Sequence, residues 1–441
     1  MQTPFKVDKN RHVVVISADA MVFEDVEQFS KLYPLCKLWD KTARVDRVRS
    51  IYPTITYPCH VTMMSGTYPE KHGVVNNEQF IPGRKGCPWV HMRESVQVET
   101  IFDRAKAAGL TTAAVYWPVT GNDKNIDYLI DEYWPQTPEE TSYECFVNSG
   151  SSPEVMEKVI VPNLPLIENR HRIHPYHDNF VMRCAADVLR EFKPNLLMIH
   201  PANIDGYRHE TGLFSPKVTQ GLYETALWLD LIMKAADDAG ILEQTDFFIV
   251  SDHGQMDIRR SVHLNVLLAE KGLITVGEDG EVADWKAWVQ SSGLSAQVFL
   301  KDPEDKEVWQ QVYDLLTGLR DEQVYGISEV FTVEEACEKH HLSGKFSFVL
   351  ETDNMTTFGN DWNRPLMRSL NNSDYRFGRA THGYLPEKSL QPTLMCWGPD
   401  IQPGAHYDNA RLIDEAPTYA YLLGLEMPGA QGEPLTELFK K

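Results

Sequence analysis

Three short apolar runs, each followed by an acidic or histidine side chain, constrain the fold of this chain most strongly. They are residues 13–16 before Asp19, residues 196–199 before His200, and residues 247–250 before Asp252. Uninterrupted apolar runs of this length are typical of strands that are buried on both faces, as in a parallel sheet. Helix-like segments alternate with these strands, so we expect an α/β fold with a mostly parallel central sheet. The carboxyl ends of parallel strands meet at one edge, where substrates normally bind.

Local patterns predict where several helices lie. We expect a helix over residues 61–66, a helix over residues 180–192 with Asn179 as its N-cap, and a final helix over residues 410–423. Asn is a preferred N-cap because its side-chain oxygen accepts a hydrogen bond from a free amide of the first turn.

Two segments interrupt the regular alternation. Residues 118–178 are rich in Pro, Asn, Asp and aromatic residues, and predict loops and short helices that cover the carboxyl edge of the sheet. Residues 256–381 contain strand-like and helical patterns between two polar segments, and predict an inserted α+β cap lobe. The catalytic core would then comprise residues 1–255 and 382–441.

Composition narrows the class of partner. A formal net charge of −21 argues against a nucleic-acid polymer as partner, because such a protein needs a basic face. The seven cysteines contain no CxxC pair, and no apolar run approaches the roughly 20 residues of a membrane span. We therefore expect a cytoplasmic protein that acts on a small molecule and does not associate with a membrane.

A hydroxyl group lies in a turn braced by Pro53 and Pro58, directly before the predicted helix at residue 61. A helix there would direct its amino-terminal amides at an anion such as phosphate. Thr54 and Thr56 both offer a hydroxyl, and the spacing to Pro58 and His60 favours Thr56 as the nucleophile.

The acidic and histidine residues favour a metal centre. Asp205 and His209 are spaced to lie on one side of a helical turn and could bind a single ion. Asp252 and His253 follow a buried strand, where such side chains are costly unless they are paired or bind a metal. Taken alone, Asp19 would more often cap a strand and His382 would more often be an ordinary loop histidine.

The order and local sequence of these segments resemble the nucleotide pyrophosphatase/phosphodiesterase family of the alkaline phosphatase superfamily. The matching residues are Asp19, Thr56-Tyr57-Pro58-x-His60, Gly66-x-Tyr68-Pro69-Glu70-x-His72-Gly73 with Asn77, Asp205-x3-His209, Asp252-His253-Gly254 and His382-Gly383. The resemblance spans roughly residues 12–400 and implies an alkaline-phosphatase-like α/β/α sandwich. Cys59 stands where the family usually has Asn, which weakens the inference about substrate more than the inference about chemistry.

The resemblance implies two zinc ions. One would be bound by Asp205, His209 and His382, and the other by Asp19, Asp252, His253 and the Thr56 hydroxyl. Mixed histidine and carboxylate ligands suit zinc on chemical grounds as well, with Mn²⁺ as an alternative.

The implied mechanism has two steps and a phospho-Thr56 intermediate. Thr56 attacks phosphorus, and a metal-activated water then hydrolyses the intermediate. The backbone amide after Thr56 and the side-chain amide of Asn77 would stabilise the developing negative charge, with the neighbouring Asn76 as an alternative to Asn77.

The family resemblance also implies a slot for a nucleobase between two aromatic rings. Tyr57 would supply one ring, and Tyr133 or Trp117 the other. The predicted activity is hydrolysis of phosphodiester or pyrophosphate bonds in nucleotide-like substrates. A phosphomonoesterase or a phosphonate hydrolase is the alternative, although monoesterases need additional cationic groups and no Arg is adjacent to Thr56 in sequence.

Three other classes of protein fit these residues less well. A sulfatase is disfavoured because its signature is absent around Cys59. A phosphotransferring mutase would share the metal ligands and differ only in the fate of the phosphate. A non-catalytic binding protein would be expected to have lost ligands that this chain retains.

Overall fold

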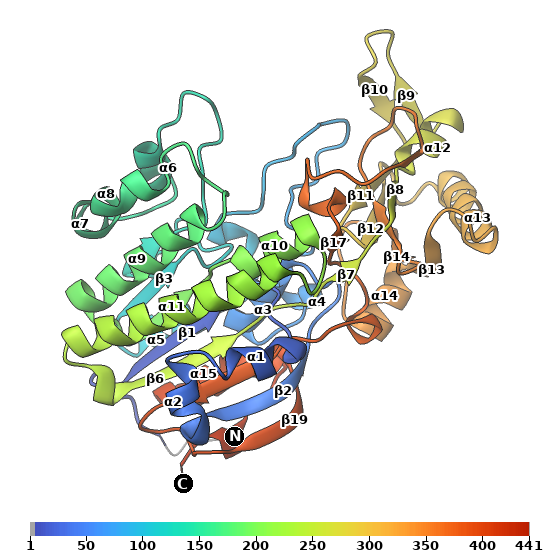
Figure 1. The fold of residues 1–441 in the computed structure, drawn as a ribbon. Helices are drawn as coiled ribbons and strands as arrows, with labels where there is room; N and C mark the ends of the chain where they lie inside the picture. Colours follow the sequence, from blue (N-terminus) through green and yellow to red (C-terminus); the bar gives the residue numbers. More distant parts are fainter. Residues whose placement is uncertain (1–4, 441) are drawn as a thin grey trace.

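The computed structural model describes residues 5–440 and is built on an eight-stranded sheet with helices on both faces (Figure 1). The strand order is β19-β2-β18-β6-β1-β5-β3-β4. In that order the strands are His406–Arg411, Ala43–Arg49, Leu394–Trp397, Thr245–Val250, His12–Ser17, Leu196–Ile199, Thr112–Val115 and Tyr128–Ile130. β18 is antiparallel to both its neighbours, and the other neighbouring strands pair in parallel. The prediction of a mostly parallel sheet is confirmed.

Strand β1 explains why the apolar runs are uninterrupted. Val13 and Val15 face one hydrophobic core, and Val14 and Ile16 face another on the opposite side of the sheet. Successive side chains of a strand point to opposite faces, so every position of a doubly covered strand must be apolar. Helices α3 (Thr56–Ser65), α5 (Ile101–Ala107) and α15 (Glu415–Leu423) cover the first face, and α9 (Tyr176–Phe192) and α11 (Pro216–Asp238) cover the second.

Three predicted helix boundaries are wrong. Helix α9 begins at Tyr176, so Asn179 lies inside the helix and not at its cap. The Asn179 side chain accepts a hydrogen bond from Trp228 Nε1 at 2.9 Å, which explains its polar character without a capping role. The last helix begins only at Glu415, because residues 406–411 pair with β2 as the edge strand β19. Helix α3 begins at Thr56 and not at residue 61.

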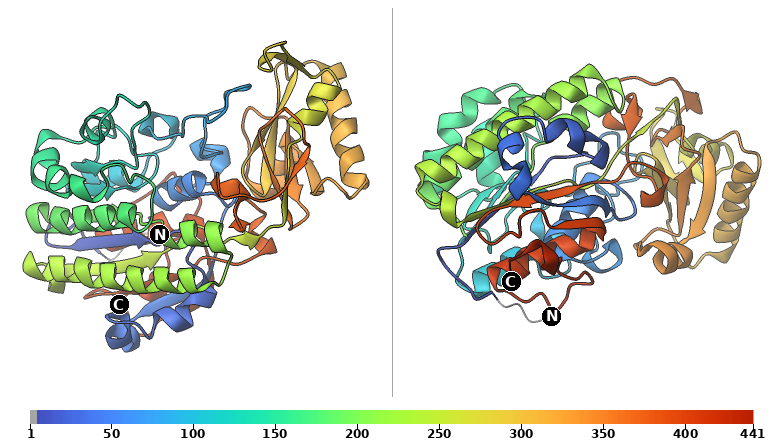
Figure 2. Two further views of the ribbon diagram at one scale, coloured as in Figure 1. Left: turned by 45° about the horizontal axis from the view of Figure 1, so that its top comes forward. Right: turned by 60° about the horizontal axis from the view of Figure 1, so that its bottom comes forward.

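Residues 256–381 contain a second, antiparallel sheet with the strand order β11-β12-β14-β13. These strands are Ala287–Ser291, Ser295–Leu300, Phe348–Thr352 and Ile327–Thr332, and the accompanying helices are α12 (Asn265–Glu270), α13 (Lys306–Asp321) and α14 (Val333–His340). The short strands of this region are β7 (Met256–Asp257), β8 (Arg260–Val262), β9 (Ile274–Val276), β10 (Val282–Trp285), β15 (Thr356–Phe358), β16 (Met367–Arg368) and β17 (Ala380–Thr381). Figure 2 shows this lobe beside the main sheet. The lobe has a hydrophobic core of its own.

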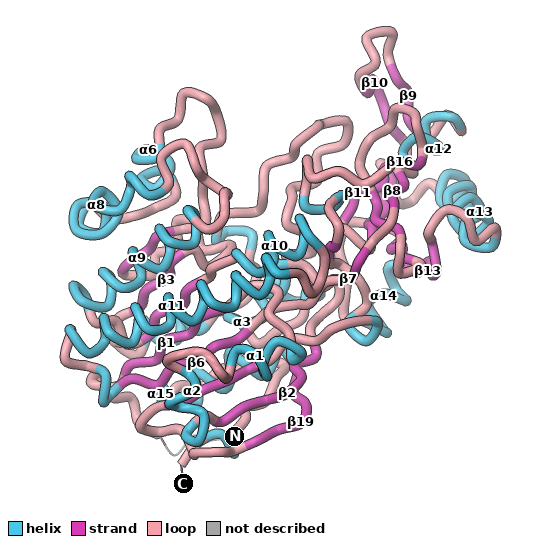
Figure 3. The backbone as a smooth tube through the Cα atoms, in the orientation of Figure 1, coloured by secondary structure: helices cyan, strands magenta, loops and turns pink. Residues whose placement is uncertain are grey.

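Residues 118–178 are mostly loops and short helices, which Figure 3 shows above α9. Their regular elements are β4, α6 (Ser142–Asn148), α7 (Pro153–Val155) and α8 (Val161–Asn163), and the remaining short helices of the core are α1 (Val26–Phe29), α2 (Leu35–Leu38), α4 (Pro69–His72) and α10 (Asn203–Thr211). In the described part of the chain, no helix combines the length and the apolar character that a membrane span requires.

Candidate metal centre

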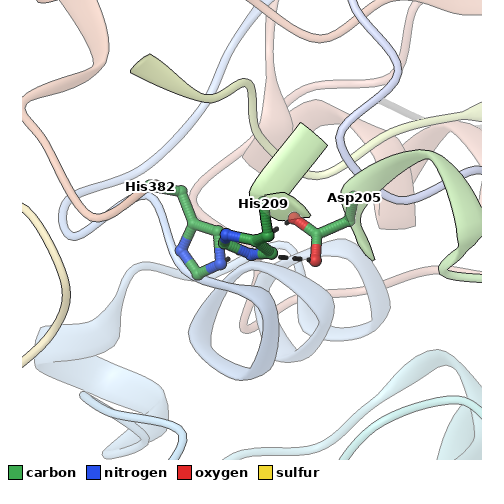
Figure 4. A group of neighbouring side chains, drawn as sticks. All are labelled: Asp205, His209 and His382. Atoms are coloured by element: carbon green, nitrogen blue, oxygen red, sulfur yellow. Dashed lines mark ion pairs between the residues drawn. The ribbon is translucent and has the colours of Figure 1, made fainter. Parts of the chain in front are cut away.

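Helix α10 places two predicted ligands together. It begins directly after β5, and the Asp205 carboxylate and His209 Nε2 lie 3.1 Å apart on successive turns. His382 follows β17 and completes the group, with its Nε2 3.9 Å from the Asp205 carboxylate (Figure 4). His209 Nδ1 forms a hydrogen bond with the Ala380 carbonyl at 2.8 Å, which orients the ring and ties α10 to β17.

A second group forms where the neighbouring strands β1 and β6 end. Asp19, Asp252 and His253 can each offer one ligand atom within 4.8 Å of the others. His253 Nε2 lies 3.1 Å from the Asp252 carboxylate and 3.6 Å from that of Asp19. Thr56 Oγ1 lies 3.3 Å from the same nitrogen, so the predicted nucleophile is at the edge of this group.

The two groups adjoin each other. The rings of His253 and His382, one from each group, are 4.2 Å apart between centroids. The structure thus brings all seven predicted ligand residues into one centre, although they come from five separate segments of the chain.

The electrostatics of the centre fit bound divalent cations. Burial, together with the neighbouring carboxylate of Asp19, raises the pKa of Asp252 to about 7. Burial and the charge of Asp205 raise the pKa of Asp19 to about 6. Asp19 Oδ1 and Asp252 Oδ2 are both buried without a hydrogen-bond partner. Buried carboxylates that repel one another and lack partners are stabilised by a shared cation.

One of the predicted ligands, His382, is in a protonation state that suits metal binding. Burial and the neighbouring His253 lower the pKa of His382 well below its usual range, which keeps the ring neutral. Only a neutral imidazole can coordinate a metal ion, so His382 needs no deprotonation before it binds.

The two threonines of this turn, Thr54 and Thr56, make different contacts. Thr56 is the first residue of α3, whereas Thr54 Oγ1 donates to the Tyr384 carbonyl at 2.9 Å and accepts from the Gly383 amide at 3.0 Å. Thr54 therefore braces the loop that carries His382, while the Thr56 hydroxyl faces the metal ligands.

The adjacent residues Asn76 and Asn77 have different hydrogen-bond partners. Asn77 Oδ1 accepts a hydrogen bond from the Tyr57 amide at 2.9 Å, beside Thr56. Asn76 Nδ2 instead donates to the Ser291 carbonyl at 3.2 Å and to Ser292 Oγ at 3.0 Å, in the inserted lobe. The Tyr57 amide is therefore engaged by Asn77 and is not free for a phosphate oxygen, contrary to the sequence-based expectation.

Several polar residues that support the ligands were not assigned a role from sequence. His200 Nε2 forms a hydrogen bond with Asp19 Oδ2 at 2.9 Å, and its Nδ1 lies 3.4 Å from the Glu132 carboxylate. Gln255 donates to both the carbonyl and the carboxylate of Asp205. Such contacts orient metal ligands and tune their basicity. Their positions in the sequence could have indicated this supporting role. His200 follows the strand β5, and Gln255 follows Asp252-His253-Gly254.

A cleft of about 380 Å³ opens at the metal centre. Its lining includes the predicted residues Asp19, Thr56, Asp205 and His209, together with Trp89, Glu132, Arg172, His174, Asp374 and Tyr375. The latter residues come from irregular segments, where periodicity carries no information about orientation. No Arg is adjacent to Thr56 in sequence, yet the fold places Arg172 in the same cleft, which weakens the sequence argument for diesters over monoesters.

The residues predicted to stack on a nucleobase lie elsewhere. Tyr57 is completely buried under Trp89, at 5.1 Å between ring centroids, and Trp117 is buried with its Nε1 donating to the His60 carbonyl at 3.3 Å. Tyr133 packs against His91. None of the three lines the cleft, whose aromatic residues are Trp89 and Tyr375, with ring centroids 6.0 Å apart.

Similarity to known proteins was found at the level of sequence. Among curated proteins, an ectonucleotide pyrophosphatase/phosphodiesterase of Caenorhabditis elegans is 26% identical over 243 residues, which cover 52% of this chain and 27% of that protein. Ectonucleotide pyrophosphatase/phosphodiesterase family member 1 of Mus musculus is 22% identical over 271 residues, or 60% of this chain and 26% of that protein. The chain thus spans about a quarter of the length of these curated relatives. Their names describe ectoenzymes, so the cytoplasmic location stays a prediction.

Similarity also extends to solved structures. Murine ectonucleotide pyrophosphatase/phosphodiesterase 5, solved as an inactive variant in complex with AMP, matches with a TM-score of 0.67 and 18% identity over 98% of this chain and 100% of that chain. This likeness confirms the expected alkaline-phosphatase-like fold class. The family model described as type I phosphodiesterase/nucleotide pyrophosphatase matches residues 13–385. The chain belongs to the type I phosphodiesterase/nucleotide pyrophosphatase family.

Proposed function

We propose that this protein is a two-zinc phosphodiesterase or nucleotide pyrophosphatase that acts on nucleotide-like substrates through a covalent phospho-Thr56 intermediate. The observation that carries the proposal is the position of Thr56 Oγ1, 3.3 Å from His253 Nε2, at the edge of two adjoining ligand groups and in the wall of the cleft. The family of the chain and the AMP bound to the murine relative support the choice of a nucleotide-like substrate.

The two groups of ligand residues would each bind one ion. Asp205, His209 and His382 would bind one, and Asp19, Asp252, His253 and the Thr56 hydroxyl the other. When bound, such ions polarise phosphoryl oxygens and lower the pKa of a coordinated hydroxyl or water. The mixture of imidazole nitrogens and carboxylate oxygens favours zinc.

The protein's own groups then carry the reaction. Thr56 Oγ1 forms a bond to phosphorus as the bond to the leaving oxygen breaks, and the leaving group departs as an alcohol or a phosphate. In the second step the oxygen of a water forms the new bond to phosphorus and releases Thr56 Oγ1, which is protonated again. Asn77 Oδ1 accepts a hydrogen bond from the amide of Tyr57, the residue next to Thr56, and its Nδ2 group would donate to a phosphoryl oxygen.

The test compares a diester with a monoester on one enzyme. Zinc-loaded wild type is expected to hydrolyse the p-nitrophenyl ester of thymidine 5′-monophosphate faster than p-nitrophenyl phosphate, and Thr56→Ala is expected to lose both activities. Thr54→Val removes the competing hydroxyl together with its contacts to the loop of His382, so a lower rate is expected, but it should still form a phosphorylated enzyme. A preference for the monoester would favour the phosphomonoesterase alternative, and full activity of Thr56→Ala would exclude Thr56 as the nucleophile.

A further inference from the structure

One cationic side chain of the cleft is held by aromatic rings alone. The Arg172 guanidinium lies 4.5 Å from the ring centroid of Trp89 and 4.5 Å from that of Trp134. Cation–π contacts of this kind fix the position of a guanidinium without neutralising its charge. Within residues 5–440, no carboxylate lies within ion-pair distance of Arg172, and it makes no hydrogen bond to the protein.

The three acidic side chains of the cleft that are not predicted metal ligands already have ion-pair partners. Asp374 is bound by the Arg376 guanidinium at 2.8 Å, Glu210 by Lys217, and Glu132 lies 3.4 Å from His200 Nδ1. Arg172 is thus a cation of the cleft lining that forms no ion pair of its own with a carboxylate of the described residues. Its five N–H donors suit the oxygens of a phosphate, which a guanidinium binds in bidentate fashion.

Two sets of contacts place Arg172 on the side of the Asp205 group. The Tyr375 ring stacks on His382 at 5.4 Å and contacts His209 at 5.6 Å and Trp89 at 6.0 Å, so a row of rings leads from these ligands to Arg172. His174, two residues after Arg172, packs against Gly206, the neighbour of Asp205.

The geometry of displacement at phosphorus indicates that the leaving group would depart toward Arg172. In an in-line displacement the leaving oxygen departs opposite the attacking oxygen. Thr56 Oγ1 lies beside His253 in one ligand group, so the leaving group departs toward the other group, Asp205, His209 and His382. Arg172 lines the same cleft and is linked to that group through the ring contacts of Tyr375 and Trp89.

We propose that Arg172, supported by Trp89 and Trp134, binds an anionic leaving group, the pyrophosphate released from a nucleoside triphosphate. The enzyme would accordingly favour a polyphosphate leaving group over a neutral one. This inference rests on the proposed function and deepens it by assigning the residue that selects the leaving group.

The test uses two substrates that transfer the same thymidylyl group to Thr56. Thymidine 5′-triphosphate releases pyrophosphate, whereas the p-nitrophenyl ester of thymidine 5′-monophosphate releases a phenol without a phosphate. Arg172→Gln is expected to lower kcat/KM for the triphosphate about 10–100-fold more than for the aryl ester, as for the loss of a charge-assisted hydrogen bond. Arg172→Lys should recover part of the difference.

Arg170 provides a matched control. It lies two residues away and stacks on Tyr176 at 4.4 Å, outside the cleft lining. Arg170→Gln should leave the ratio of the two kcat/KM values at the wild-type value. Equal losses on both substrates in Arg172→Gln, or no loss on either, would overturn the inference.

A binding measurement separates this inference from the proposed function. Titration of inorganic pyrophosphate into zinc-loaded Thr56→Ala, with and without Arg172→Gln, should show at least about tenfold weaker binding when Arg172 is replaced. If wild type cleaved neither substrate but pyrophosphate binding still depended on Arg172, the proposed function would fail and the anion subsite would stand. Binding that is independent of Arg172 would refute the subsite.

Discussion

His200 illustrates how a residue outside the ligand set can govern a metal ligand. Its Nε2 holds Asp19 Oδ2 at 2.9 Å, and its other nitrogen faces Glu132. We expect His200→Ala to weaken zinc binding about 10–100-fold, because partners of this kind orient the ligand and maintain its basicity. Competition with a chromophoric chelator measures the affinity. The control is His12→Gln at the opposite end of β1, where the ring contacts the Pro194 carbonyl, and unchanged affinity in His200→Ala would refute the orienting role.

Asp246 gives the fold a pH dependence that is separate from the metal centre. It lies in β6 near its amino end and accepts a hydrogen bond from the Asp400 amide at 3.1 Å. Burial raises the pKa of Asp246 to about 7. Since this folded-state pKa lies above the unfolded value of about 4, its stabilising contribution is complete below about pH 4 and is lost as the pH rises through about 7.

Replacing Asp246 with a neutral residue tests whether its ionisation destabilises the fold as the pH rises. Asp246→Asn should gain stability relative to wild type between pH 5 and pH 8, by at most about 4 kcal/mol. Urea unfolding at the two pH values measures the difference. A difference that does not change with pH would show that Asp246 is ionised equally easily in both states.

At the scale of elements, the contact of α10 with the turn at residues 169–175 depends on one glycine. A Cβ at Gly206 would lie 2.5 Å from His174 Nε2, and the His174 ring is fixed by a 2.7 Å contact of its Nδ1 with Asp178. Gly→Ala inside a helix normally stabilises a protein by about 1 kcal/mol. Here we expect Gly206→Ala to destabilise by about 1–3 kcal/mol, because the ring must move.

A double variant distinguishes this clash from other effects. The combined loss of melting temperature in Gly206→Ala with His174→Ala should be smaller than the sum of the two single losses, because the clash requires both side chains. The single His174→Ala variant accounts for the loss of the contact with Asp178. Thermal unfolding followed by circular dichroism measures all three variants, and strictly additive losses would exclude the clash as the cause.

The elements of the sheet were predictable from sequence for a physical reason. Residues 13–16 and 247–250 are apolar at every position because both faces of their strands are covered, and no other common arrangement requires this of so short a run. The edge strand β19 lacks that signature, since most of its residues are exposed or half-buried, and its first part was therefore missed and its last part assigned to a helix.

At the scale of the whole molecule, an ion pair between a half-buried lysine and a buried carboxylate joins the lobe to the core. Lys388 Nζ lies 3.0 Å from the carboxylate of Glu351 in β14, and the Leu385 amide donates to the same carboxylate at 3.2 Å. Burial raises the pKa of Glu351 to about 7, although Lys388 opposes the increase. The pair therefore keeps a carboxylate buried between two parts of the chain that are distant in sequence.

Removal of one partner should be costly. Lys388→Met is expected to lower the free energy of unfolding by about 3–5 kcal/mol at pH 8, because it leaves an uncompensated buried charge. Lys388→Met with Glu351→Gln should recover much of that loss. Urea unfolding at pH 8 measures both variants, and a double variant no more stable than the single one would show that the buried charge is not the origin of the loss.

The type of sheet, the family and the identity of the residues that gather at the carboxyl edge were all predictable from the sequence. Asp19, Asp252 and His253 follow buried strands, and Asp205 and His209 are one helical turn apart, so strand order and helical geometry bring them together without further information.

The surroundings of these residues follow from the tertiary structure and were not predictable from the sequence. Trp89, Arg172 and Tyr375 come from irregular segments, so neither periodicity nor spacing predicts which way their side chains point. The fold also placed Tyr57 beneath Trp89 and not in the cleft. Regular backbone hydrogen bonding fixes the ligands, whereas the walls of the cleft depend on side-chain packing between distant segments, which no local pattern records.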